Sequence, residues 1–308
     1  MTRVSRRDFV RIGAAGAVAA PLSLGSVPVH AAAPTAQEVV DRIRKSLGVA
    51  WQPDTVDTFK AGDPSTVVTG IVTTSLATID VMRRAVKAGA NLIVTSGPTF
   101  YSRADRPTPP AGRSRGAATP PSPDPVFTAK NEFIKANNLV VWRFSDHWRL
   151  RTPNPFTEGM IDALGWTRYA ASGATDHADR VTVPAVTLDR LVEDVRKKLN
   201  ARGGMRSVGN PQLRVRRIAL LPGSVPIQTT LEVLPDVDAL IAGEIREWES
   251  SEYTRDAITE GRDKALILVG RTVSEDSGMK FCAQWLESIV PEVRSRWMAA
   301  GDPYWRPA

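Results

Sequence analysis

Few side chains of this 308-residue chain are suited to acid/base chemistry or metal binding. Histidine occurs only three times, as His30, His147 and His177. Neither of the later two accompanies the sharp strand-to-helix turn that presents a serine nucleophile, so a Ser-His-Asp hydrolase triad is not supported. His177, in a Thr-Asp-His-Ala segment, is typical of a surface loop.

Carboxylates are grouped at one point of the chain. Glu244, Glu247 and Glu249 lie near Arg246 and Trp248. Paired carboxylates at this spacing can act as general acid and base. The same pattern occurs on solvated helix faces and at subunit contacts, and the sequence leaves these alternatives open.

One glycine follows an apolar segment in a position that suits phosphate binding. Residues 222–224 read Pro-Gly-Ser directly after a predicted strand. Backbone amides in such a loop can cradle a phosphate, although a single glycine there more often marks a turn.

Strand and helix patterns alternate along the rest of the chain. Apolar residues at helical spacing, or in short β-branched runs, define these elements. Helices are expected at 35–48, 76–88, 130–137, 156–164, 250–260 and 276–290. Strands are expected at 67–73, 91–95, 139–144, 238–243 and 264–269, and residues 181–221 contain two strands around an amphipathic helix.

This alternation predicts a layered α/β protein. A strand, a helix and a strand joined by connections of this length imply a parallel crossover. We therefore expect two subdomains, with mixed sheets flanked by helices. Residues 104–126 hold seven prolines and predict an exposed insertion, partly disordered, because proline removes backbone donors. A middle subdomain, roughly 127–222, is expected between the two halves of the first.

The N-terminus has the pattern of an export signal. Ser5-Arg6-Arg7-Asp8-Phe9-Val10 is followed by an alanine-rich apolar run and by small residues at 31–33. This arrangement predicts a twin-arginine signal peptide over 1–33, cleaved to leave 34–308. We expect the export machinery as a partner and a periplasmic or other extracytoplasmic location, with no stable membrane span in the mature form.

Charge argues against nucleic acid as a partner. The formal net charge is +7, and the signal region contributes four arginines and one aspartate of it, or +3. About +4 remains in the mature chain, without a cluster of basic and aromatic residues.

Four segments resemble the Nif-three-like dinuclear metal-centre family. NLIVTSGPTF (91–100) is similar to the strand and loop that carry two ligands just before a proline, and VVWRFSDHW (140–148) to the second ligand strand. ALIAGE (239–244) resembles the family's Gly-Glu motif, and GRTVSE (270–275) its Gly-His-x-x-Ser-Glu motif. The resemblance covers most of residues 36–290. It implies a two-subdomain fold, a homo-oligomer such as a hexameric ring, and the label of type 2 GTP cyclohydrolase I.

Carried across this resemblance, the ligand positions are mostly lost. The paired ligands fall on Ser96 and Gly97, the distal ligand of the second strand on Arg149, and the last histidine on Arg271. Glycine has no donor, a serine hydroxyl is a poor ligand, and a guanidinium has no free lone pair. Two divalent ions are therefore not expected.

Three residual donors remain at these motifs. They are Glu275, His147 and Asp146, and His147 would face the site if residues 145–149 were extended. The resemblance thus implies either no cofactor or one weakly bound zinc, iron or manganese ion.

The arginines suggest a different use of the site. Arg271 and Arg149, with Arg103 or Arg143, would line a pocket for phosphate or carboxylate, and Glu275 would orient one guanidinium. Two function classes follow. One is an exported binding protein for a small anionic or nucleotide-like ligand. The other is a metal-dependent hydrolase of nucleotide-like or phosphorylated substrates, and the sequence leaves catalysis open.

Overall fold

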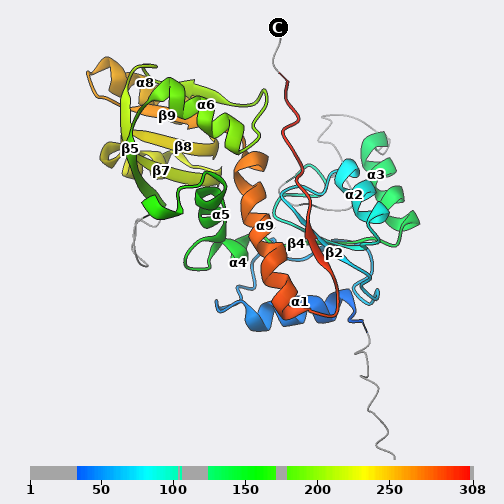
Figure 1. Ribbon diagram of the computed structural model, residues 1–308. Helices are drawn as coiled ribbons and strands as arrows, with labels where there is room; N and C mark the ends of the chain where they lie inside the picture. The colour runs from blue at the N-terminus through cyan, green and yellow to red at the C-terminus, as the bar shows by residue number, and fades with distance from the viewer. Residues whose placement is uncertain (1–32, 103–104, 106–123, 171–178, 306–308) are drawn as a thin grey trace, which may run out of the picture. The chain divides into compact units, whose positions relative to one another are not determined.

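Two five-stranded mixed sheets form the fold (Figure 1). The computed structural model describes residues 33–102, 105, 124–170 and 179–305. The predicted signal peptide, apart from its last residue, and most of the proline-rich segment lie outside the described residues. Among the described residues, no helix has the length and apolarity needed to cross a membrane.

The first sheet combines four parallel strands with one antiparallel edge strand. Its order is β1 (Phe59–Ala61), β4 (Val140–Arg143), β3 (Leu92–Thr95), β2 (Ile71–Thr74) and β10 (Ser295–Trp297), with β1 antiparallel. Alternate residues face opposite sides of a strand. Leu92 and Val94 therefore pack with α1 (Ala36–Ser46) and α9 (Arg271–Ile289). Ile93 packs on the other face, with α2 (Ile79–Lys87) and α3 (Pro125–Ala136).

The second sheet has three parallel strands between two antiparallel edges. Its order is β5 (Arg180–Thr187), β7 (Arg214–Ser224), β8 (Ala239–Glu244), β9 (Ala265–Leu268) and β6 (Arg206–Val208). Helices α5 (Pro155–Ala163) and α6 (Leu188–Lys198) cover one face. Residues of α7 (Ile227–Val233) and α8 (Glu252–Thr259) pack on the other, and a π-helical turn, η3 (Glu247–Ser251), leads into α8.

The predicted layered α/β class is confirmed by these two sheets and their helices. Three strands of three residues each, β1, β6 and β10, were not expected from the sequence. Such short strands carry too little alternation to be recognised without their partners.

The predicted subdomain boundaries need correction. Strand β4 pairs with β3 in the first sheet, whereas β8 and β9 belong to the second. The segment inserted into the first sheet therefore runs later than 127–222, with its strands between Arg180 and Leu268, and β10 returns the chain to the first sheet. Residues Ala33–Ala308 form one compact unit.

Two local predictions also fail for identifiable reasons. Helix α3 begins at Pro125, inside the segment expected to be an insertion, because the Asp124 side chain accepts a hydrogen bond from Phe127 N at 2.8 Å. Proline suits the first position of a helix, where no N–H is needed. Residues 146–149 form the short helix α4 (Asp146–Arg149) rather than an extended segment.

Candidate functional site

The carboxyl ends of parallel strands from both sheets converge on one region. Ser96 follows β3, Glu244 ends β8, and Arg271 opens α9 three residues after the end of β9. Binding sites in open α/β sheets lie beyond the carboxyl ends of the strands. Helix α9, which runs on from β9, contacts both β2 and β8 and so links the two ends.

Glu275 is the buried centre of this region. Its residue is 1% exposed, and its two carboxylate oxygens have different partners. Ser96 Oγ donates to Oε2 at 2.7 Å, and Arg149 Nη2 donates to Oε1 at 2.9 Å. Arg149 Nη1 also donates to the carbonyl oxygen of Pro222 at 3.1 Å, which ties the site to β7.

Arg271 faces the same carboxylate oxygen. Its Nε lies 3.6 Å from Glu275 Oε1, too far for a hydrogen bond, and is buried without a hydrogen-bond partner in the described part of the chain. Its Nη1 lies 3.4 Å from Glu244 Oε1. One oxygen of Glu275 therefore faces two guanidinium groups.

A glycine makes this approach possible. Gly223 has φ +90, and a Cβ there would lie 2.7 Å from Glu275 Oε1 and 2.8 Å from Arg149 Nη2. Its amide donates to Ser274 Oγ at 3.0 Å. The Pro-Gly-Ser segment, expected as a turn, lies within β7, and its register with β8 shifts between Leu221 and Ser224.

A second buried ionic group borders the first. Arg143 Nε donates to Ser96 O at 3.2 Å, and its Nη1 lies 3.9 Å from Asp105 Oδ2. Burial lowers the pKa of Arg143, and the positive charge of Arg271 acts in the same direction, whereas Asp105 opposes both. Burial also lowers the pKa of Lys130 to about 8, although its Nζ donates to Thr99 O at 2.6 Å.

His147 is held in a network of its own. The ring is 0% exposed, with Nδ1 2.7 Å from Asp57 Oδ2 and Nε2 accepting from Gln52 N at 2.8 Å. These partners assign the proton to Nδ1. The ring also stacks on Trp51, with centroids 3.7 Å apart. Neither ring nitrogen is left to bind a metal ion.

Asp146 has structural partners too. Its Oδ2 accepts hydrogen bonds from Thr55 Oγ1 and Val56 N. The prediction that Asp146 and His147 join Glu275 as ligands therefore needs correction. It assumed an extended segment, and helix α4 turns these side chains toward Asp57 and Thr55 instead.

The donor set does not fit a metal ion. In the described residues, no three His, Cys, Asp or Glu side chains converge as a ligand group. Glu275 is surrounded by a serine and two guanidinium groups, which supply no further anionic ligand and repel a cation. At the other position where the resemblance implies a ligand, a Cβ on Gly97 would lie 2.3 Å from Leu76 Cδ2, so only glycine fits beside that side chain.

The predicted group of glutamates separates in the structure. Glu244 faces Arg271, Glu247 pairs with Arg206 at 2.6 Å, and Glu249 with Arg246 at 3.1 Å. These carboxylates therefore do not form an acid/base pair. Arg103 and His177 lie outside the described residues.

A cavity of about 700 Å³ opens beside Arg271. Arg206, Glu244 and Glu247 contribute charged groups to its wall, and Tyr304 an aromatic ring. Pockets of this size accommodate small organic ligands.

Sequence analysis missed two buried carboxylates close to these groups. Asp57 is 0% exposed and accepts hydrogen bonds from the amides of Ser145, Asp146 and His147. Asp276, directly after Glu275, is 9% exposed. Neither lies in a motif that would have drawn attention to it.

No protein-family model and no curated protein matches the sequence. Solved structures do match over most of the chain. A Bacillus cereus protein related to NIF3 has a TM-score of 0.66 at 12% identity, covering 90% of this chain and 100% of that one. The Staphylococcus aureus hypothetical protein SA1388 has a TM-score of 0.64 at 16% identity, covering 89% and 99%. Protein ybgI, described as of unknown function, has a TM-score of 0.63 at 15% identity, covering 88% and 100%.

These similarities define the fold of the chain. It is a NIF3-like fold, in agreement with the resemblance seen in four segments of the sequence. At 12–16% identity the likeness concerns the fold alone. What the site does has to be argued from its own residues.

Proposed function

We propose that the chain is a NIF3-like binding protein in which arginines occupy a degraded metal site and hold a small anionic or nucleotide-like ligand. The observation that carries this proposal is the meeting of Arg149 and Arg271 at one oxygen of Glu275. The two guanidinium groups share one buried carboxylate, and the second carboxylate beside them, Glu244, is 48% exposed and so offsets the charge of Arg271 less strongly. Planar guanidinium groups bind phosphate or carboxylate through paired hydrogen bonds.

The unsatisfied donor of Arg271 supports the same conclusion. Its Nε is buried without a hydrogen-bond partner among the described residues, and a buried donor of this kind gains from an acceptor. The contact of Arg271 with Glu244 at 3.4 Å is partly exposed, so an incoming anion can replace it at little cost. Tyr304, in the adjoining cavity, suits a ligand with a planar ring.

The test combines metal analysis with ligand binding. The full chain is purified without chelators, its zinc, iron and manganese are measured, and calorimetry is run with inorganic phosphate, pyrophosphate and nucleoside triphosphates. We expect well under one equivalent of metal and saturable binding of at least one anion. Arg271→Gln and Arg149→Gln should each weaken that binding tenfold or more.

Arg255→Gln is the matched control, because Arg255 is an exposed arginine of α8 paired with Glu252. One or two equivalents of bound metal, with a turnover that Glu275→Gln abolishes, would instead support a metal-dependent hydrolase of nucleotide-like or phosphorylated substrates. Export by the twin-arginine route and assembly into a homo-oligomer remain part of the proposal. Signal cleavage and the mass in solution test these two points.

A further inference from the structure

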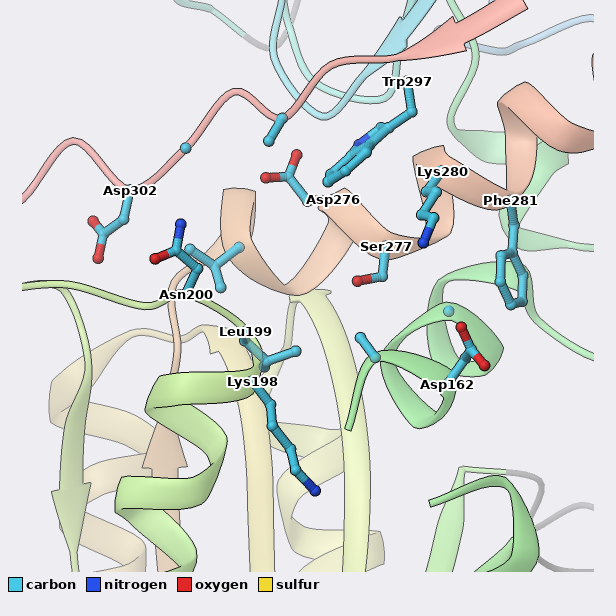
Figure 2. Close-up of a pocket in the computed structure, with 15 residues that line it drawn as sticks. Asp162, Lys198, Leu199, Asn200, Asp276, Ser277, Lys280, Phe281, Trp297 and Asp302 are labelled. Atoms are coloured by element: carbon cyan, nitrogen blue, oxygen red, sulfur yellow. The ribbon is translucent and has the colours of Figure 1, made fainter. Parts of the chain in front are cut away.

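A second cavity is lined in part by α9 (Figure 2). It measures about 300 Å³, and Asp276, Ser277 and Lys280 line it from that helix. Asp162 contributes from α5, Asn200 from the segment after α6, and the C-terminal segment closes the wall. Glu275, Arg149 and Arg271 do not line this cavity, although Val273 and Asp302 border both it and the cavity beside Arg271.

Two charged residues of this wall hold the wall itself together. Lys198 Nζ donates to the carbonyl oxygen of Leu164 at 2.5 Å. Asp302 Oδ2 accepts from the amides of Arg202 and Gly204, which fastens the C-terminal segment to the loop after α6. These two side chains are therefore engaged in structure rather than available to a ligand.

Other polar side chains of the cavity have no partner. Within the described ranges, the side chains of Asp162, Asn200, Ser277 and Lys280 make no hydrogen bond or ion pair. They come from three separate elements and meet around one small space (Figure 2). Asp162, Asn200 and Lys280 are exposed and Ser277 is half-buried, so these side chains are accessible to a polar ligand.

Asp276 is the buried anion of this cavity. It is 9% exposed, and Oδ1 accepts hydrogen bonds from Ser75 Oγ at 2.5 Å and Ala300 N at 3.4 Å. Both donors are neutral groups. Lys280 lies one helical turn further along α9, yet no ion pair joins the two among the described residues. A carboxylate and an ammonium group therefore line the same cavity without neutralising each other.

The indole of Trp297 supplies a partly exposed aromatic wall. Its residue is 37% exposed and lines the cavity with Asp276. An indole face attracts a cationic group, and the attraction grows as the cation is desolvated. Trp297 and Asp276 thus favour an ammonium group, whereas Lys280 and the amide of Asn200 favour a carboxylate.

We propose that this cavity binds a small zwitterion of the α-amino acid type. The ligand's ammonium group pairs with Asp276 beside Trp297, and its carboxylate pairs with Lys280. A ligand with only a carboxylate would leave the buried Asp276 without a charged partner, and a ligand with only an ammonium group would forgo the contact with Lys280. The volume of about 300 Å³ suits a molecule of this size.

Calorimetry on the full chain tests the proposal with each of the common L-amino acids. Four probes lack one or both charges of the zwitterion. Ethylamine carries only the positive charge, acetate only the negative charge, glucose neither, and inorganic phosphate only a phosphate group. We expect saturable binding of at least one amino acid, and at least tenfold weaker binding of all four probes in the Arg271→Gln variant, in which the anion site is disabled. Asp276→Asn and Lys280→Gln should each weaken amino acid binding tenfold or more.

Lys87→Gln, on the exposed end of α2, is the matched control and should bind as the unaltered chain does. Lys280 is exposed, so its substitution leaves folding intact even if Asp276→Asn does not. The proposal is overturned if no amino acid binds the folded chain, if glucose or phosphate binds more tightly than any amino acid to the Arg271→Gln variant, or if Lys280→Gln leaves amino acid binding unchanged. None of these three outcomes depends on the anion site at Arg271, because the probes are compared in the Arg271→Gln variant.

Discussion

Arg149 Nη2 lies 2.9 Å from Glu275 Oε1, although 126 residues separate them in sequence. Arg149 comes from the helix after β4 of the first sheet, and Glu275 from the helix after β9 of the second. Their ion pair therefore joins the carboxyl ends of the two sheets. Ser96, from a third chain segment, donates a hydrogen bond from its hydroxyl to Oε2 of Glu275.

Replacing Glu275 with Gln should destabilise the fold. The change leaves Arg149 and Arg271 facing each other without the carboxylate between them, and breaking a buried pair is costly because one charge stays uncompensated. Since Arg149 is 35% exposed, solvent reduces the loss to about 1–3 kcal/mol. Urea unfolding measures it. Glu252→Gln, on the surface of α8, should cost less than about 0.5 kcal/mol, and an equal loss in both variants would contradict the role given to Glu275.

Gly223→Ala should disturb the ion pair of Arg149 and Glu275, because the added methyl group would collide with it. A Cβ at 223 lies 2.7 Å from Glu275 Oε1, whereas a Cβ at Gly261 meets nothing within 4 Å. Both glycines have positive φ, at +90 and +76, so both alanine variants lose about 1–2 kcal/mol from backbone strain. We expect Gly223→Ala to lose at least about 1 kcal/mol more in the free energy of unfolding, and to bind the anion more weakly. Equal losses would mean that the side chains move aside freely.

Asp57 should contribute strongly to the stability of the fold, although it lies in a loop. It accepts three backbone amides and faces the His147 ring at 2.7 Å, with no exposed surface. Asp57→Asn replaces an acceptor with a donor and should cost about 2–4 kcal/mol. Asp54→Asn, three residues earlier and exposed, is the control and should change stability little. Thermal or urea unfolding measures the stability of both variants. Equal stability of the two would show that Asp57 is dispensable for the fold.

The pH dependence of stability should carry a signature of Asp276. Burial raises the pKa of Asp276 to about 6 from its ordinary 3.8, so the folded chain keeps this proton over a range in which the unfolded chain has lost it. Stability from this group is therefore greatest below about pH 4 and is lost as the pH rises to about 6. The loss is about 3 kcal/mol, because one pKa unit corresponds to about 1.4 kcal/mol.

Asp276→Asn tests this dependence, because an amide resembles the protonated acid. Relative to the unaltered chain, the variant should gain stability as the pH rises from 4 to 7, measured by urea unfolding in the absence of ligand. A difference that stays constant over this range would show that the Asp276 proton is not linked to folding.

Much of the fold could be predicted from the sequence, because its signals are local. The expected strands at 91–95 and 139–144 coincide closely with β3 and β4, and the helix expected at 35–48 with α1. Periodic burial on one face produced these patterns. Residues 145–149 were expected to be extended. They form a helix instead, because their amides donate hydrogen bonds to Asp57 from a distant loop.

The sequence by itself determined which side chains stand at the former ligand positions. It showed that serine, glycine and arginine stand where the resemblance implies metal ligands. Only the tertiary structure decided which of these residues meet. Ser96, Arg149, Arg271 and Glu275 come together because strands from two sheets end at one place, whereas His147 turns away to Asp57. Hydrogen bonds and ion pairs between distant segments are set by folding geometry, which no local pattern of residues encodes.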